Sequence, residues 1–238
     1  MGVISIKYIK SDIDVRGKTL NKLKMTKVKR FVFNPFQVNT YVVSNKTSQC
    51  VIVDGGCSNE NELKILKNYI SANGLMPVLL LNTHAHIDHI IGNYDICDTF
   101  KIPLAAHPDS VKFMKVSKDY ASVFGLEMKN VKEIDIFLSE KEPITFGNTV
   151  LHVLDTPGHA DGSTCFYNKD DDYVITGDVL FFQSIGRTDL DTGDYDKLQK
   201  SIWTKLFALP DKTVVYPGHG PETTIGYEKV NNPFVSLG

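Results

Sequence analysis

One short segment of the chain concentrates side chains that bind metals. Thr83-His84-Ala85-His86-Ile87-Asp88-His89 places three imidazoles and one carboxylate within six residues, in a chain with only seven histidines. These groups are the usual ligands of a catalytic zinc ion, which keeps one position open for water. His84 and His86 are two residues apart, so in an extended segment both point to the same side. The spacing predicts a metal site, with Asp88 and His89 placed to serve a second ion.

Three more ligand-type residues follow predicted strands. His159 and His219 each come after an apolar run and a Pro-Gly pair, and Asp178 comes after the run 174–177. Because strand ends are rigid and the following loops can turn side chains toward one point, we expect these residues to join the first segment. Asp178 is the candidate bridging ligand, since a carboxylate has two oxygens and paired catalytic metals lie about 3.5–4 Å apart. His107 and His152 are not expected to be ligands.

Hydrophobic periodicity and turn residues predict the strands and helices that position these residues. Runs of strands with helices between them predict a layered α/β or α+β sandwich. Strands are expected at 28–33, 38–44, 50–54, 78–81, 103–106, 150–154, 164–167, 173–176 and 213–216. Helices are expected at 60–72, 87–97, 108–124 and 194–209.

Composition restricts the classes of function. The chain has 238 residues, 42% of them hydrophobic and 23% charged, as in ordinary globular proteins. No apolar run approaches the roughly 18 residues of a membrane span, so we expect no membrane partner. The formal net charge is −2, but residues 1–30 carry nine Lys or Arg against two Asp. The acidic remainder predicts that nucleic acid is not a partner.

The N-terminal segment and the cysteines bear on location. Residues 1–24 are basic and lack the apolar stretch of a secretory signal, so we expect a poorly ordered extension before a single domain at 25–238. Neither aromatic nor amphipathic patterning supports a membrane or nucleic-acid tether there. The four cysteines form no C-x-x-C pair. Without an export signal, they are expected to be reduced thiols in the cytoplasm.

Together these motifs resemble the metallo-β-lactamase superfamily over about residues 28–234. The resemblance implies an α+β fold, the αβ/βα sandwich of two mixed sheets flanked by helices, with two divalent metal ions at one edge. Zinc is expected, although nitrogen and oxygen ligands also accept iron or manganese. Asp88 is in addition the candidate catalytic residue. The implied ligands are His84, His86 and His159 for the first ion, Asp88, His89 and His219 for the second, and Asp178 for both.

Finer features are similar to glyoxalase II-type thioesterases. They are Thr156-Pro157-Gly158-His159-Ala160-Asp161-Gly162-Ser163, Gly177-Asp178-Val179-Leu180-Phe181 and Tyr216-Pro217-Gly218-His219-Gly220-Pro221. Ser184-Ile185-Gly186-Arg187-Thr188-Asp189 and Asn232-Pro233-Phe234 look like the short bacterial members. The implied reaction is attack of a metal-bound hydroxide on a hydroxyacyl thioester, a small molecule such as S-lactoylglutathione.

Two parts of that resemblance stay open. Full-length glyoxalase II enzymes have a C-terminal helical domain that contacts glutathione, whereas here the sequence stops soon after His219, with residues 221–238 left. The thiol carrier is therefore not implied. Arg187 is a candidate for binding a substrate carboxylate through its planar guanidinium, but an ion pair with Asp189 explains it equally well.

Other functions fit parts of the same sequence. Persulfide dioxygenases also show a Gly-Arg-Thr-Asp segment and hold one iron by two histidines and one aspartate, which would be His84, His159 and Asp178 here. β-Lactamase action is less favoured because the finer features point elsewhere, and the chain has no room for the inserted domain of the nucleases. His86 argues against the flavodiiron branch, which has Glu at that position. A non-catalytic metal protein would be favoured by a missing ligand, and none is missing.

Overall fold

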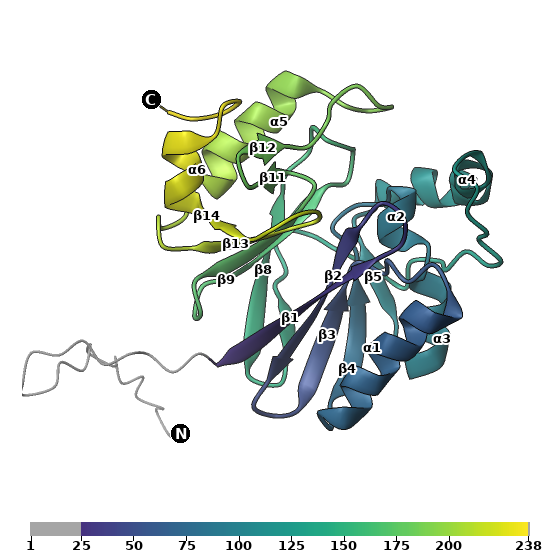
Figure 1. Ribbon diagram of the computed structural model, residues 1–238. Coiled ribbons are helices and arrows are strands. Elements are labelled where there is room, and N and C mark those ends of the chain that lie inside the picture. The colour runs from purple at the N-terminus through teal and green to yellow at the C-terminus, as the bar shows by residue number, and fades with distance from the viewer. Residues whose placement is uncertain (1–24, 238) are drawn as a thin grey trace, which may run out of the picture.

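The computed structural model describes residues 25–237 and shows two six-stranded sheets packed face to face, with helices on both outer faces (Figure 1). The predicted extension, residues 1–24, lies outside the described residues. The first sheet has the order β1 (Thr26–Phe33), β2 (Val38–Asn45), β3 (Gln49–Val53), β4 (Met76–Leu81), β5 (Leu104–Ala106) and β6 (Ile136–Phe137). The second has the order β14 (Thr223–Thr224), β13 (Val214–Pro217), β10 (Tyr173–Gly177), β9 (Thr164–Asn168), β8 (Thr149–Asp155) and β7 (Ile144–Phe146).

The first sheet gathers its strand ends through parallel pairing. β1, β2 and β3 pair antiparallel, whereas β3, β4, β5 and β6 run parallel. Parallel neighbours need crossover connections, here through α1 (Glu60–Ala72), α3 (Asn93–Phe100) and α4 (Ser110–Val123). The carboxyl ends of β3 and β4 therefore lie side by side. They lead into Asp54 and into the segment that begins at Asn82.

The second sheet brings three strand ends to one edge. β8, β9 and β10 pair antiparallel in sequence, so β8 runs in the same direction as β10, and β13 pairs parallel with β10. The segments after β8, β10 and β13 consequently leave the sheet at the same edge. Backbone bonds join this edge to the first sheet: Thr164 N donates to Thr83 O (2.7 Å), and Asn39 N donates to Gly218 O (2.6 Å).

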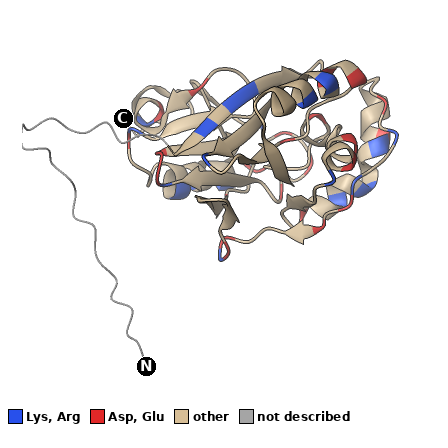
Figure 2. Cartoon of the chain, turned by 90° about the horizontal axis from the view of Figure 1, so that it is seen from below, with Lys and Arg blue, Asp and Glu red and all other residues tan. Residues whose placement is uncertain are grey.

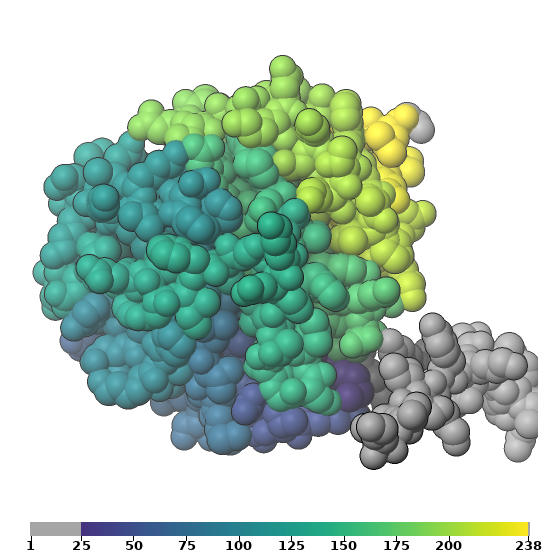
Figure 3. Space-filling view, turned by 180° about the vertical axis from the view of Figure 1, so that it is seen from behind, coloured from purple at the N-terminus to yellow at the C-terminus, as the bar shows by residue number. Residues whose placement is uncertain are grey.

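Hydrophobic side chains fill the space between the sheets and beneath the helices. The cluster between the sheets takes residues from both, including Tyr41, Leu81, Phe166 and Ile175, all at most 1% exposed. Two further clusters lie under α1, α3 and α4 (Ser110–Val123) on one side and under α5 (Tyr195–Ser201) and α6 (Ile225–Asn231) on the other. Each such side chain, fully buried, contributes about 1.5–3 kcal/mol. In the space-filling view, the two halves of the chain lie against each other (Figure 3).

The predicted two-sheet sandwich is confirmed, but two predicted helices are interrupted. Residues 87–97 form α2 (Ile87–Ile90) and the start of α3, with Gly92 between them. Gly92 N donates to Gly55 O (2.7 Å), and a Cβ on Gly92 would lie 2.5 Å from the Cys57 carbonyl oxygen. The close approach of two backbones, which periodicity cannot reveal, breaks this helix. The helix expected at 194–209 is α5 followed by a π-helical segment, η1 (Ile202–Leu206).

Several short elements were not predicted, namely β6, β7, β11 (Leu180–Phe181), β12 (Ser184–Ile185), β14 and α6. The strands among them have two or three residues, too few to show a period. All four cysteines are buried and free.

Charged side chains gather on helices and loops, while most strands other than β1 carry few (Figure 2). This follows from the layering, because each sheet is covered on one face by helices and on the other by its partner sheet. Within residues 25–237, no helix combines the length and apolar character needed to cross a membrane.

Gly92→Ala is expected to lower the free energy of unfolding by about 1–3 kcal/mol, because the added methyl group overpacks against backbone atoms that cannot move aside. Urea denaturation measures the difference. Asp98→Ala, on the following helix α3, removes only an exposed ion pair with Lys101 and should change the stability by less than about 0.5 kcal/mol. Equal stability of the Gly92 variant and the unsubstituted protein would contradict the close-packing explanation.

Candidate metal centre

The structure brings together all seven residues that the sequence singled out. Four come from the segment after β4, and the others follow β8, β10 and β13. Within each of three groups, the ligand atoms lie within 4.8 Å of one another. The groups are His84, His86 and His159; His84, His89 and Asp178; and Asp88, His89 and His219.

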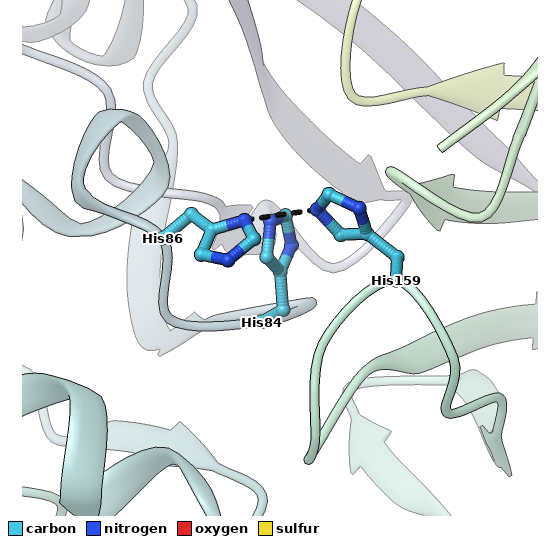
Figure 4. Close-up of side chains that lie close together, drawn as sticks. All are labelled: His84, His86 and His159. Carbon is cyan, nitrogen blue, oxygen red and sulfur yellow. Dashed lines mark hydrogen bonds between the residues drawn. The ribbon is translucent and has the colours of Figure 1, made fainter. Parts of the chain in front are cut away.

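The first group is a cluster of three imidazoles, in which His86 and His159 point toward each other from opposite sides with His84 between them (Figure 4). Nδ1 of His86 and Nε2 of His159 are 2.9 Å apart. Nδ1 of His159 lies 2.8 Å from the carbonyl oxygen of Arg187. A carbonyl only accepts, so this Nδ1 carries the proton and Nε2 offers its lone pair to the cluster. Such a contact fixes both the tautomer and the ring orientation of a metal-binding histidine.

The third group, which is Asp88, His89 and His219, combines a carboxylate with two imidazoles. Oδ2 of Asp88 lies 3.1 Å from Nε2 of His219 and 3.6 Å from Nε2 of His89. The other nitrogen of His89, Nδ1, lies 2.9 Å from Oδ2 of Asp54. His89 is thus oriented by a carboxylate behind it and presents Nε2 to the cluster.

Asp178 stands between the first and the third group. Its Oδ1 lies 3.3 Å from Nε2 of His89, and its Oδ2 lies 3.7 Å from Nε2 of His159 and 3.6 Å from Nε2 of His219. Position 218, in the neighbouring turn, must be glycine, because a Cβ there would lie 2.1 Å from Oδ1 of Asp178. Asp178 thus reaches imidazoles of both groups, and its bridging role stays a prediction.

Three buried atoms indicate that the cluster is built for cations. Nε2 of His84, Nε2 of His89 and Oδ1 of Asp178 have no hydrogen-bond partner within the described part of the chain. Buried polar atoms are almost always paired, because an unpaired one costs free energy. Nε2 of His89 and Oδ1 of Asp178 form an ion pair at 3.3 Å but no hydrogen bond, and Nε2 of His84 has neither within the described residues. Ligand atoms that converge in this way fit a divalent metal centre.

The local electrostatics favour the protonation states that bind metals. Burial lowers the pKa of His84 far below its ordinary value and that of His86 to about 4, so both imidazoles are neutral near pH 7. Burial by itself raises the pKa of Asp178, but His89 and the other nearby imidazoles outweigh burial and hold this pKa below its usual range. Neutral imidazoles and ionised carboxylates are the forms that coordinate metal ions.

His89 is the exception among the buried imidazoles. Burial lowers its pKa, but the carboxylates of Asp88, Asp178 and Asp54 together outweigh burial and raise the pKa well above the ordinary value. The carboxylates of Asp88 and Asp178 also outweigh burial at His219 and raise the pKa of that imidazole.

Asp54 is the supporting residue that the sequence analysis missed. It follows β3 with a positive φ of 61° and is only 1% exposed. Its carboxylate accepts hydrogen bonds from Thr83 N (2.8 Å) and Thr83 Oγ1 (2.8 Å) and contacts His89. Asp54 therefore holds in place both Thr83, at the start of the segment that carries four ligands, and the ring of His89. The available signal was an aspartate at a strand end directly before Gly55-Gly56.

The C-terminal Asn232-Pro233-Phe234 motif holds the hairpin β11–β12 in place through hydrogen bonds. The buried side chain of Asn232 donates to Ser184 O (3.1 Å) and to Glu228 Oε2 (2.8 Å). The same Glu228 oxygen accepts from Gln183 N (3.0 Å). The hairpin leads directly to Arg187, whose carbonyl orients a metal-centre histidine, so two motifs far apart in sequence support one ligand.

The side chain of Arg187 forms a two-point ion pair with Asp189, with Nε–Oδ1 and Nη2–Oδ2 distances of 2.7 and 2.6 Å. The pair is exposed, and Arg187 also lines the pocket above the metal centre. The ion-pair interpretation is thus observed, and binding of a substrate carboxylate stays a prediction.

The two remaining histidines lie outside the cluster, as expected. His152 is exposed on β8, with its ring facing Tyr167. His107 directly follows β5, but its Nδ1 accepts from Asp109 N (3.1 Å). A strand-end position alone therefore does not make a ligand.

A pocket of about 570 Å³ opens over the cluster. Its floor includes His86, Asp88, His159, Asp178 and His219. A small molecule in this pocket would reach ligands of the first group and of the third.

Asp54→Asn is expected to weaken metal binding by about 10–100-fold, because the amide cannot accept all the hydrogen bonds that hold Thr83 and His89. Competition with a chromogenic chelator measures the dissociation constants. His152→Ala is the control and should bind metal like the unsubstituted protein. Unchanged affinity in the Asp54 variant would show that this carboxylate does not position the ligands.

Comparison with known proteins identifies the family. Residues 33–219 match the family described as the metallo-beta-lactamase superfamily. A probable metallo-hydrolase of Bacillus subtilis is 37% identical over 88% of this chain and 98% of its own, and a hydroxyacylglutathione hydrolase of Haemophilus influenzae is 34% identical over 84% and 94%. The solved structure named BLEG-1 B3 metallo-beta-lactamase is 37% identical, covers 89% of this chain and 100% of its own, and superposes with a TM-score of 0.82. This chain therefore belongs to the metallo-beta-lactamase superfamily and has its fold.

Proposed function

We propose that this protein is a metal-dependent hydrolase that cleaves hydroxyacyl thioesters of the S-lactoylglutathione type, using two divalent metal ions, zinc by preference. The observation that carries the proposal is the cluster of seven candidate ligands, five of which line the floor of a pocket, with three buried ligand atoms that lack hydrogen-bond partners. His84, His86 and His159 would hold one ion, and Asp88, His89 and His219 the other. Asp178 would contact both.

Metal ions held in such a site lower the pKa of water to near neutrality and polarise a carbonyl oxygen. The chain itself orients the ligands. Arg187 O and Asp54 fix the rings of His159 and His89. Asp88 is partly exposed on the pocket floor, and we assign its carboxylate the catalytic role of orienting the attacking water.

No cysteine is suited to act as a nucleophile in place of water. Burial raises the pKa of Cys50, Cys97 and Cys165 to about 12 and that of Cys57 still further. Because the thiolate is the nucleophilic form, these thiols are inert at neutral pH. Direct attack by water suits a thioester, whose thiolate is a good leaving group. The relative named a hydroxyacylglutathione hydrolase supports this substrate class.

A second candidate is β-lactam hydrolysis, because the solved structure at 37% identity is named a B3 metallo-beta-lactamase. Both reactions transfer an acyl group to water, so the same ligand set suits either. We favour the thioester because the glyoxalase-like Ser184–Asp189 segment and Asn232 are joined in one network beside the metal centre.

The first test is metal content by plasma emission, paired with hydrolysis of S-lactoylglutathione and of a β-lactam. We expect nearly two metal ions per chain, thioester turnover, and loss of turnover after chelation with recovery on adding zinc. β-Lactam turnover alone would select the second candidate. One iron per chain with oxygen uptake on glutathione persulfide would show a dioxygenase instead.

Asp178→Asn should weaken both metal positions and lower kcat/KM at least about 1,000-fold, since it removes the shared negative charge at 3.3–3.7 Å from three imidazoles. Metal titration and steady-state kinetics measure the two effects, and His152→Ala is the matched control. Full metal content and full rate in the Asp178 variant would rule out the two-metal assignment.

A further inference from the structure

One wall of the pocket over the metal centre is built from large apolar side chains. Helix α4 contributes three of them at helical spacing and its C-cap residue is a fourth, and the β1–β2 turn and the loop after β12 add one each. They are Phe113, Val116, Tyr120, Phe124, Phe36 and Leu190. All but Phe113 are exposed. Apolar side chains exposed together in a concave site mark a surface that binds apolar groups.

The wall contacts a metal ligand and joins segments far apart in sequence. The ring of Phe113 meets that of His86 edge to face at 5.8 Å. Phe36 and Phe124 meet edge to face at 5.3 Å, although they come from a hairpin turn and a helix end. A substrate that reaches the metal ligands therefore enters a pocket that these side chains line.

The charged side chains of the same pocket are already paired. Lys112 contacts Asp161, and Arg187 holds Asp189 at two points. The remaining carboxylate outside the metal ligands, Asp191, accepts from the Tyr120 hydroxyl (3.3 Å). Within the described residues, no lining cation is left without a carboxylate partner. A carrier that bears carboxylates would have to replace these ion pairs.

We infer that the thiol half of the substrate is uncharged and carries an apolar group of about benzyl size, with Val116 and Phe124 as specificity-determining residues. The inference rests on the proposed thioesterase function. A hydroxyacyl group is small and polar and would lie at the ligands on the floor. The thiol half would then extend along the wall.

The test compares lactoyl thioesters of three alkyl thiols: benzyl mercaptan, N-acetylcysteamine and glutathione. The thiols share an alkyl sulfur, so the comparison varies the carrier rather than the acyl group. We expect kcat/KM for the benzyl thioester to exceed that for the glutathione thioester at least about tenfold, the amount that modest apolar contacts supply.

Val116→Ser and Phe124→Ser should each reduce this preference about tenfold, mainly through KM, while the N-acetylcysteamine thioester changes less than about threefold. Val123→Ser is the matched control, because Val123 lies on the same helix, is 80% exposed and does not line the pocket. Far-ultraviolet circular dichroism and zinc content confirm that each variant is folded and loaded.

A preference for the glutathione thioester, or equal use of all three, would overturn this inference and leave the thioesterase proposal standing. Wall variants that keep the benzyl preference would also overturn it. Failure to hydrolyse any of the three would refute the thioesterase proposal, and the inference with it.

Discussion

The metal centre depends on the packing of the two sheets, because neither sheet supplies a complete set of ligands. The first sheet provides the segment from His84 to His89, and the second provides His159, Asp178 and His219. Backbone bonds between Thr164 and Thr83 and between Asn39 and Gly218 join the two edges at the ligands themselves. The hydrophobic core between the sheets therefore also determines the positions of the ligands.

This arrangement is electrostatically costly without a cation. Asp54, Asp88 and Asp178 surround His89 in a largely buried cluster, and their negative charges raise its pKa. Buried charges are destabilising unless they are paired or coordinate a metal. A divalent ion that binds the folded chain would offset the cost and shift the folding equilibrium toward the native state.

The metal ligands and the pocket walls have separate roles. Ligands of this kind suit acyl transfer to water in general, and fold membership alone does not select among such reactions. Selectivity has to come from groups that touch the rest of the substrate. Here these groups lie on α4, in the β1–β2 turn and in the loop around Leu190.

The sequence by itself predicted the layered fold, most of the longer elements and the seven residues of the cluster. These are local signals: His84 to His89 are contiguous, and each other ligand follows a strand with an apolar period. The tertiary structure alone showed the contact of Asp54 with His89 and that of the Arg187 carbonyl with His159. It alone also showed the hydrogen bond from Asn232 to the β11–β12 hairpin and the interruption of the predicted helix at Gly92. Each of these is a contact between backbone or side-chain atoms of segments distant in sequence. Such contacts leave no periodic pattern, because they are decided by which strands become neighbours when the two sheets pack.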